Sequence, residues 1–181
     1  MPLARDLWPS AKALRRDGEY VLFRRTAERD TENMLVVATA SEQPAPRSVE
    51  RLKHEYALRD SLDSDWAAKP LRLTHEHGRT LLALVDPGGE LLSGLLDRRW
   101  ETGTFLRVAI GMSGALGRVH AQGLIHKDVK PDHVLVDPAT ALPGLLDLAL
   151  PRAWRVSVRR RTCRKRLREP SHIWRPSRRD A

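Results

Sequence analysis

The stretch His126-Lys127-Asp128-Val129-Lys130-Pro131-Asp132-His133 places six ionisable side chains in eight consecutive residues. An apolar run, VLVD, follows at residues 134–137, and a further acidic residue, Asp147, lies fourteen residues after His133. The segments HVLVD and GLLDLAL flank Pro138-Ala139-Thr140, which predicts a short hairpin. The sequence therefore predicts a loop of charged residues that is followed directly by a hairpin.

A long helix is predicted in front of this loop, from about Thr104 to Ala121, and Gly123 is expected to end it. Apolar residues recur along it at steps of three and four, which predicts a buried stripe of Phe105, Ala109, Met112, Leu116 and Val119. Further upstream, the turn Pro87-Gly88-Gly89 precedes ELLSGLLDRRW, for which we predict a second helical stretch.

Short strands dominate the sequence from Glu19 to about Leu84. The apolar runs EYVLF, NMLVVATA and RTLLALV are bounded by Asp, Gly and Pro, as is typical of strands. One helix interrupts them, because SVERLKHEYALRDSL has apolar residues at near-helical spacing, and Ser48 is a candidate N-cap. The first half of the chain is thus expected to be strand-rich with one inserted helix.

Charge is distributed unevenly along the 181 residues, although the net charge is +9. Residues 148–181 contain 12 Lys or Arg and 2 Asp or Glu, whereas residues 1–147 contain 20 basic and 21 acidic residues. A basic surface would indicate nucleic acid or an acidic membrane, and the body of this chain is neutral. We therefore expect no designed nucleic-acid or membrane partner, and only incidental binding of polyanions by the tail.

Leader, membrane and redox signals are absent from the sequence. The first residues lack the apolar core of a secretory leader, and no run approaches the roughly 20 apolar residues of a membrane span. The single cysteine, Cys163, excludes an internal disulfide and a multi-cysteine zinc site. We expect a cytoplasmic protein.

The charged loop resembles the catalytic loop of protein kinases, whose pattern is H-R-D-L-x-x-x-N followed by a short hairpin and D-F-G. His126, Asp128 and Lys130 match this pattern, and Asp147 falls at the D-F-G aspartate. The lysine after the histidine resembles, more narrowly, the amino-terminal serine/threonine-kinase-like domain of large bacterial hybrids that also contain an ATPase domain and a sensor histidine kinase. The resemblance covers residues 18–147.

This resemblance implies an α+β, two-lobed kinase-like fold with an incomplete C-lobe. Residues 1–87 would form the N-lobe strands and one helix, residues 88–147 part of the C-lobe with the catalytic loop, and residues 148–181 a basic tail. The function implied is ATP- and Mg²⁺-dependent phosphoryl transfer to hydroxyl groups of a protein substrate, in a signal-transduction role.

Residue roles follow by the same resemblance. Asp128 would orient the substrate hydroxyl, Lys130 would offset charge on the moving phosphoryl group, and His126 would be a scaffold residue. Asp147 would hold magnesium against the ATP phosphates, with His133 at the position of the second metal ligand. Glu55 would be the helix glutamate that pairs with a strand lysine.

Three departures from the family pattern concern ATP and its metal. His133 replaces the asparagine, and imidazole is a poor ligand for magnesium. The strand MLVVATA has no lysine, with Ala38 near the expected position, and the only glycine before Tyr20 is Gly18, so the G-x-G-x-x-G loop is missing. The alternatives are therefore a catalytically inactive pseudokinase or regulatory module, or a non-functional gene fragment.

The tail departs from the family at once, since Asp147 is followed by Leu148-Ala149-Leu150 instead of F-G. One DNA sequence that encodes Asp147 to Trp154, when it is translated from its third base, gives F-G-I-A-S-R-L. The same operation on Arg168 to Ala181 gives GALAYMAPEQTGR, which contains the A-P-E motif that closes a kinase activation segment. We therefore predict a frameshift after Asp147, with residues 148–181 out of frame and disordered.

Overall fold

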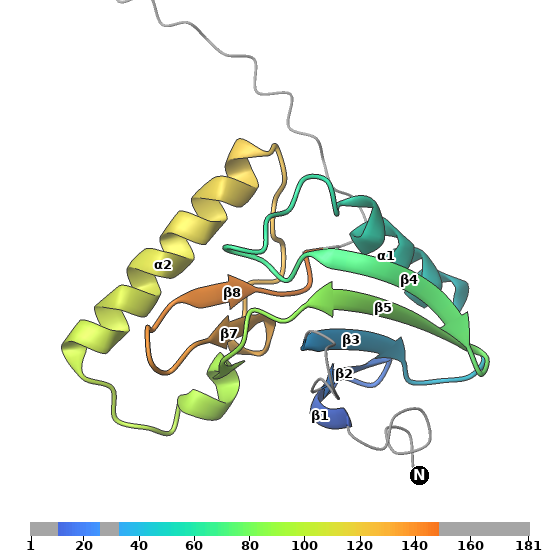
Figure 1. Ribbon diagram of the computed structural model, residues 1–181, viewed down its shortest axis with the longest axis horizontal. Helices are drawn as coiled ribbons and strands as arrows, with labels where there is room; N and C mark the ends of the chain where they lie inside the picture. Colours follow the sequence, from blue (N-terminus) through green and yellow to red (C-terminus); the bar gives the residue numbers. More distant parts are fainter. Residues whose placement is uncertain (1–10, 26–32, 149–181) are drawn as a thin grey trace, which may run out of the picture.

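The computed structural model describes residues 11–25 and 33–148, and the predicted out-of-frame tail lies outside them apart from its first residue, Leu148. A five-stranded antiparallel sheet forms the first part of the structure, in the order β1-β2-β3-β5-β4. Its strands are β1 (Ala11–Arg16), β2 (Tyr20–Arg25), β3 (Met34–Thr39), β4 (Pro70–Glu76) and β5 (Arg79–Val85). The mixed α/β architecture is compatible with the N-lobe of a protein kinase (Figure 1).

The strands β2, β3 and β5 place apolar side chains on both faces of the sheet. Their sequences are therefore continuous apolar runs. Side chains alternate across a strand, so each strand contributes to two clusters. Val36 and Ala38 of β3 belong to one cluster, and Leu35 and Val37 belong to the other, which faces the helix α1. The predicted strands EYVLF, NMLVVATA and RTLLALV are confirmed.

The helix α1 spans Pro46–Ala57 and packs near β4 and β5. It begins earlier than predicted, because Pro46 occupies the first turn and Ala45 is the N-cap, without a side-chain hydrogen bond. The prediction of Ser48 as N-cap was therefore wrong. Ser48 is buried inside the helix, and its hydroxyl donates to Glu19 at 3.0 Å.

The second part of the structure is a three-stranded sheet, β6-β7-β8, with the helix α2 packed against it. In Figure 1, α2 lies on the opposite side of the molecule from α1. The elements are β6 (Glu90–Leu91), η1 (Leu92–Leu95), α2 (Thr102–Ala121), η2 (Pro131–His133), β7 (Val134–Val136) and β8 (Pro143–Leu145). The predicted hairpin is confirmed, and Gly123, with φ 72°, follows the end of α2 as expected.

Two predictions in this part were wrong. ELLSGLLDRRW is not one helix, because Glu90–Leu91 pairs with β7 and only one 3₁₀ turn follows. The buried face of α2 differs from the predicted one. Its most buried residues are Val108, Ala115 and Val119, while Phe105 is 58% exposed. The side of α2 that faces β8 packs closely, with Gly111 against Pro143.

Backbone contacts join the two parts and fix the segment that leads to Asp147. Leu145 donates to the carbonyl of Trp66 at 3.0 Å, and its own carbonyl accepts from Ala68 at 2.9 Å. The next residue, Leu146, donates to the carbonyl of His133 at 2.9 Å. Asp147 is therefore held directly beside the charged loop.

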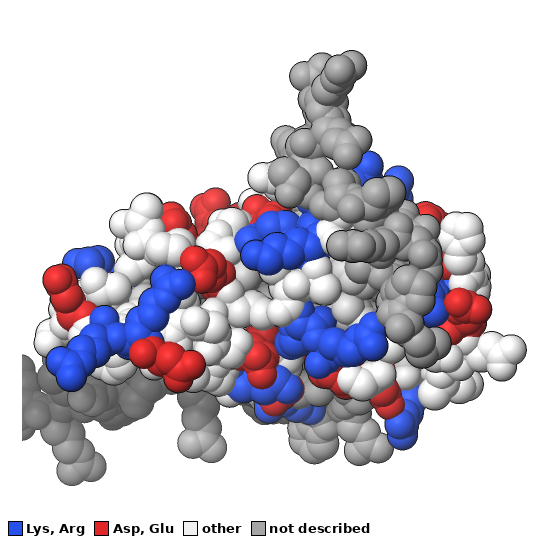
Figure 2. Space-filling view, turned by 90° about the horizontal axis from the view of Figure 1, so that it is seen from below, with Lys and Arg blue, Asp and Glu red and all other residues white. Residues whose placement is uncertain are grey.

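The surface of the described residues carries charges of both signs. Figure 2 shows acidic and basic side chains interspersed over one face of the molecule, in keeping with the nearly neutral body of the sequence. No helix within residues 11–25 and 33–148 combines the length and apolar character needed to cross a bilayer.

Candidate functional site

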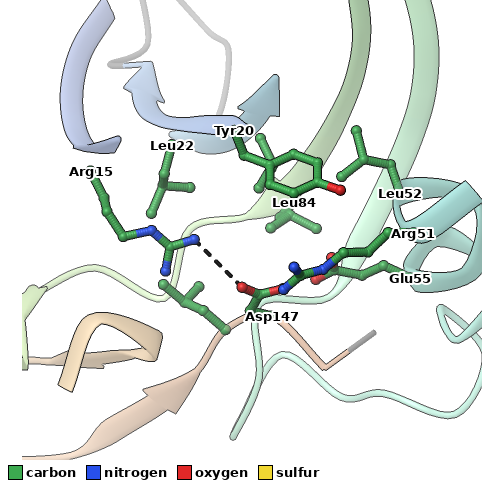
Figure 3. A pocket seen from close by; sticks show the side chains of 10 residues that line it. Arg15, Tyr20, Leu22, Arg51, Leu52, Glu55, Leu84 and Asp147 are labelled. Carbon is green, nitrogen blue, oxygen red and sulfur yellow. Dashed lines mark hydrogen bonds and ion pairs between the residues drawn. The ribbon is translucent and has the colours of Figure 1, made fainter. Parts of the chain in front are cut away.

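The site is centred on the carboxylate of Asp147, which is 11% exposed and has a left-handed backbone with φ 61°. Two arginines and one histidine, from three different elements, surround it. The guanidinium of Arg51 lies 2.5 Å away, the ring Nε2 of His133 2.9 Å, and the guanidinium of Arg15 3.5 Å. Figure 3 shows Arg15 approaching from the β1 side, and Arg51 and Glu55 approaching from α1.

Each arginine is also fixed by a second contact. Arg15 donates through Nη1 to the carbonyl of Asp132 at 2.8 Å, which ties β1 to the charged loop. The guanidinium of Arg51 lies 5.2 Å from the centre of the Tyr20 ring, within the range of a cation–π contact. These contacts orient both arginines toward Asp147.

His133 is almost fully buried, with 1% exposure, and both of its ring nitrogens face oxygen acceptors. Nδ1 lies 2.7 Å from the carbonyl oxygen of Asp128 and must donate to it, because a carbonyl only accepts. Nε2 lies 2.9 Å from the carboxylate of Asp147. His133 thus connects the backbone of Asp128 to the side chain of Asp147.

The two buried carboxyls of the site have pKa values displaced in opposite directions. Burial raises the pKa of Asp147, but the hydrogen bond from His133 and the charge of Arg51 outweigh it and hold the pKa below its usual range. Burial, followed by the negative charge of Asp147, raises the pKa of Glu55 to about 8. At pH 7 Asp147 is ionised and Glu55 is protonated.

Glu55 lies on the buried face of α1, 3% exposed, and its carboxyl is hydrogen-bonded to the backbone N–H of Leu148. Among the described residues, no lysine of β3 meets it, as expected from the sequence. The β3 residue that faces this pocket is Val37, while Ala38 points to the opposite side of the sheet. The cation beside Glu55 is instead Arg51, one helical turn before it.

Asp128 and Lys130 lie together at the exposed end of the site. Their side chains form an ion pair of 2.9 Å, which is the leading cause of the lowered pKa of Asp128. His126 donates through Nε2 to the carbonyl of Leu146 at 3.0 Å and accepts at Nδ1 from the N–H of Asp128. Burial lowers the pKa of His126, which agrees with a neutral ring that supports the loop.

The structure therefore brings His133, Asp147 and Glu55 into one cluster, and Asp128 with Lys130 beside it. Sequence reasoning missed Arg15 and Arg51. Arg51 could have been found from its i, i+4 spacing with Glu55 in a predicted helix. Arg15 gave no such signal, because its strand was not predicted.

The surroundings of Asp147 do not suit a magnesium ion in this arrangement. Magnesium is bound through one or two carboxylates together with waters and phosphates, so it needs a carboxylate that is free to face it. Two guanidinium groups and an imidazole already contact the carboxylate of Asp147.

The pocket beside Asp147 is too small for a nucleotide in this conformation. It is lined by Arg15, Arg51, Glu55, Asp147 and apolar side chains from the sheet, and its volume is about 10 Å³. That is near the lower limit for a single water molecule, whereas small-molecule pockets are roughly 300 Å³ or more. Between β1 and β2 the chain makes a tight turn at Gly18, with φ 77°.

Comparison with known proteins adds partial matches to serine/threonine kinases. The chain is 32% identical over 73 residues to the serine/threonine-protein kinase pkn3 of Myxococcus xanthus, covering 39% of this chain and 13% of that protein. It is 35% identical over 94 residues to the serine/threonine-protein kinase cot-1 of Neurospora crassa, covering 49% and 16%. It is 29% identical over 128 residues to the serine/threonine-protein kinase CBK1 of Debaryomyces hansenii, covering 66% and 17%.

No protein-family model matches the chain. The matched region spans less than a fifth of the length of each of these three relatives. Together with the five-stranded sheet and the charged loop, the partial matches support a kinase-like relationship for this chain.

Proposed function

We propose that this chain is the front part of a serine/threonine-kinase-like domain that acts as a pseudokinase, a binding or regulatory module without metal-dependent phosphoryl transfer. The observation that carries the proposal is the environment of Asp147, whose carboxylate is contacted by Arg15, Arg51 and His133. In the family that the sequence resembles, this carboxylate faces magnesium.

Electrostatics decides whether the carboxylate of Asp147 pairs with the arginines or faces a magnesium ion. Two unit charges 4 Å apart interact by about 4 kcal/mol at the effective dielectric of a protein surface, so a divalent ion at this distance is attracted by Asp147 by about 8 kcal/mol and repelled by each guanidinium by about 8 kcal/mol. With Arg15 and Arg51 both in place, the repulsion exceeds the attraction. Magnesium would therefore bind at Asp147 only if Arg15 and Arg51 both moved away.

An active ATP-dependent kinase is the second candidate. The observation in its favour is the ion pair of Asp128 and Lys130, which is exposed and accessible to a substrate hydroxyl. ATP and Mg²⁺ would be its cofactors, and its protein substrate is unidentified.

Phosphoryl transfer from radiolabelled ATP, measured on the full chain with a generic protein substrate, separates the two candidates. The pseudokinase proposal predicts the same background incorporation for the wild type and for Asp128→Asn, in MgCl₂ and in MnCl₂. Circular dichroism of both proteins controls for folding. Incorporation that depends on Asp128 would establish the active kinase instead.

The wider setting of the domain is also a proposal. We propose the boundary near residue 87, a cytoplasmic location, and a parent protein of the bacterial hybrid kinase type, interrupted by a frameshift after Asp147. The support is the hidden F-G and A-P-E coding of the tail and the match to a bacterial kinase. Reading the DNA of this locus tests it, because stop codons in the shifted frame would exclude the frameshift.

A further inference from the structure

The helix α2 is apolar on the side that faces away from the sheet as well as on its buried side. Figure 1 shows α2 along one outer edge of the molecule, with β7 and β8 on one side of it. The buried side contains Val108, Ala115 and Val119. On the opposite side, Leu106 is 49% exposed and Ile110 is 70% exposed. A helix that is apolar all round is normally covered on all sides, so the outward side predicts an interaction surface.

The outward side forms one continuous strip, which we call the α2 seam. Its positions recur at steps of three and four residues and carry no charge: Gly103, Leu106, Ile110, Ser113 and Gly117. This is the spacing of the contact positions in a pair of packed helices, and it extends for about 21 Å along α2. The Ser113 hydroxyl already donates to the carbonyl of Ala109 at 2.9 Å. The α2 seam can therefore be buried without leaving a polar side chain unpaired.

The two halves of the α2 seam have complementary shapes. The large side chains of Leu106 and Ile110 lie in its N-terminal half, and the small residues Ser113 and Gly117 lie in its C-terminal half. Among the described residues, a Cβ at Gly117 would meet nothing within 4 Å, so this half is open to a side chain from outside. Leu106 and Gly117 lie at equal distances from the midpoint of α2, and so do Ile110 and Ser113. A second α2 seam that runs in the opposite direction would place each large side chain over a small residue.

The charges of α2 are compatible with this antiparallel arrangement, and the helix dipoles favour it. In an antiparallel pair, the positive N-terminal end of each helix lies beside the negative C-terminal end of the other. The ionisable residues of α2 are Arg107, Arg118 and His120, and the loop in front of it adds two acidic and two basic residues, Asp97, Arg98, Arg99 and Glu101. Arg107 and Arg118 are exposed and each follows a seam residue by one position, which places them beside the seam in water. Arg107 would lie about 10 Å from Arg118 of the second copy, roughly one Debye length at physiological salt, so their repulsion is largely screened.

We propose that α2 binds the α2 of a second copy of this chain, antiparallel and through the α2 seam, about a two-fold axis at the helix midpoint. A two-fold interface must be self-complementary, and the α2 seam meets this requirement because its two halves fit each other. A helix pair of this length buries on the order of 1,000 Å² in total, at the low end of specific interfaces. We therefore expect a weak, reversible dimer that forms at tens to hundreds of micromolar protein.

Sedimentation velocity of the full chain, from micromolar to several hundred micromolar protein, measures this dimer. We expect a shift from monomer to dimer as the concentration rises. Ile110→Asp places a charge at the centre of the α2 seam and should weaken association by roughly 10-fold or more. The control is Leu96→Asp, because Leu96 is also an exposed apolar residue, at 57%, but lies outside α2. Circular dichroism of each variant controls for folding.

A pair of substitutions tests the orientation of the two helices. Gly117→Leu fills the space proposed for Leu106 of the second copy, so it should abolish the dimer. The Tm of the monomer should rise, because glycine disfavours a helix and the added side chain has room. Adding Leu106→Ala exchanges the large and the small residue of this layer, which should restore association in an antiparallel pair. In a parallel pair each residue would face its own copy, and the double variant would not recover.

A monomer at every concentration would overturn the proposal, and so would a dimer that Ile110→Asp leaves intact or that the double variant fails to restore. A lower Tm of Gly117→Leu at concentrations where the chain is monomeric would overturn it as well, because another segment of the same chain would then cover the α2 seam. The proposal goes beyond the pseudokinase function and does not depend on it. Phosphoryl transfer tests that function separately, so the two can fail independently.

Discussion

Replacing Glu55 by glutamine should stabilise the protein, and increasingly so as the pH rises. The carboxyl of Glu55 has a pKa of about 8 in the folded chain, against an ordinary value of 4.5, because of its burial and the charge of Asp147. Between these two values the unfolded chain has released the proton and the folded chain has kept it. The folded state is therefore progressively disfavoured as the pH rises from 4.5 to 8.

The size of the effect follows from the width of this window. Each pH unit contributes about 1.4 kcal/mol, so the full penalty at pH 8 is on the order of 3–5 kcal/mol. Glutamine has the same shape, stays neutral, and can accept the hydrogen bond from Leu148. At 2–4 °C per kcal/mol, Glu55→Gln should raise the Tm by roughly 6–20 °C near pH 8 and by little near pH 5.

Thermal unfolding followed by circular dichroism, at pH values from 5 to 8, measures this difference. The matched control is Glu50→Gln on the same helix, because Glu50 is exposed and pairs with Lys53 at the surface. Its Tm should follow that of the wild type across the range. A Glu55→Gln advantage that is constant with pH, or that shrinks as the pH rises, would refute the assigned protonation state of Glu55.

Further substitutions test the cluster and the packing. Asp147→Asn removes the carboxylate that Arg15, Arg51 and His133 all contact, so urea unfolding should show a loss of about 3–5 kcal/mol, and an unchanged midpoint would contradict the ion-pair geometry. Gly89→Ala should cost at least 2 kcal/mol, because φ is 78° and a Cβ would lie 2.3 Å from the Val136 carbonyl oxygen. Gly94→Ala is its control, since a Cβ there meets nothing within 4 Å.

The parts of the fold that local sequence determines were predicted well. The hairpin of β7 and β8, the end of α2 at Gly123, and the strands β2, β3 and β5 follow from turn residues and apolar runs. The strands β1 and β4 were missed, because AKALRR and PLRLTHE are edge strands rich in charged and polar residues. The face of α2 was misassigned, since the short sheet covers only one side of the helix.

The candidate site was predicted only in part, for a physical reason. The residues of the charged loop are close in sequence, and a family pattern identifies them. The partners of Asp147 on β1 and α1 are distant in sequence: Arg15 is 132 residues away and Arg51 is 96 residues away. No local pattern specifies that two arginines from the first sheet and its helix occupy the place beside Asp147, because tertiary packing alone brings them there.

The most direct test of the central claim is a manganese titration of the full chain, followed by electron paramagnetic resonance of the free ion. Manganese is a spectroscopically visible substitute for magnesium at oxygen sites. Because Arg15 and Arg51 already neutralise Asp147 and His133 also contacts its carboxylate, we expect no saturable site at millimolar manganese, and Asp147→Ala should give the same curve as the wild type. Saturable binding that disappears in Asp147→Ala would contradict the claim and establish a metal-binding kinase site.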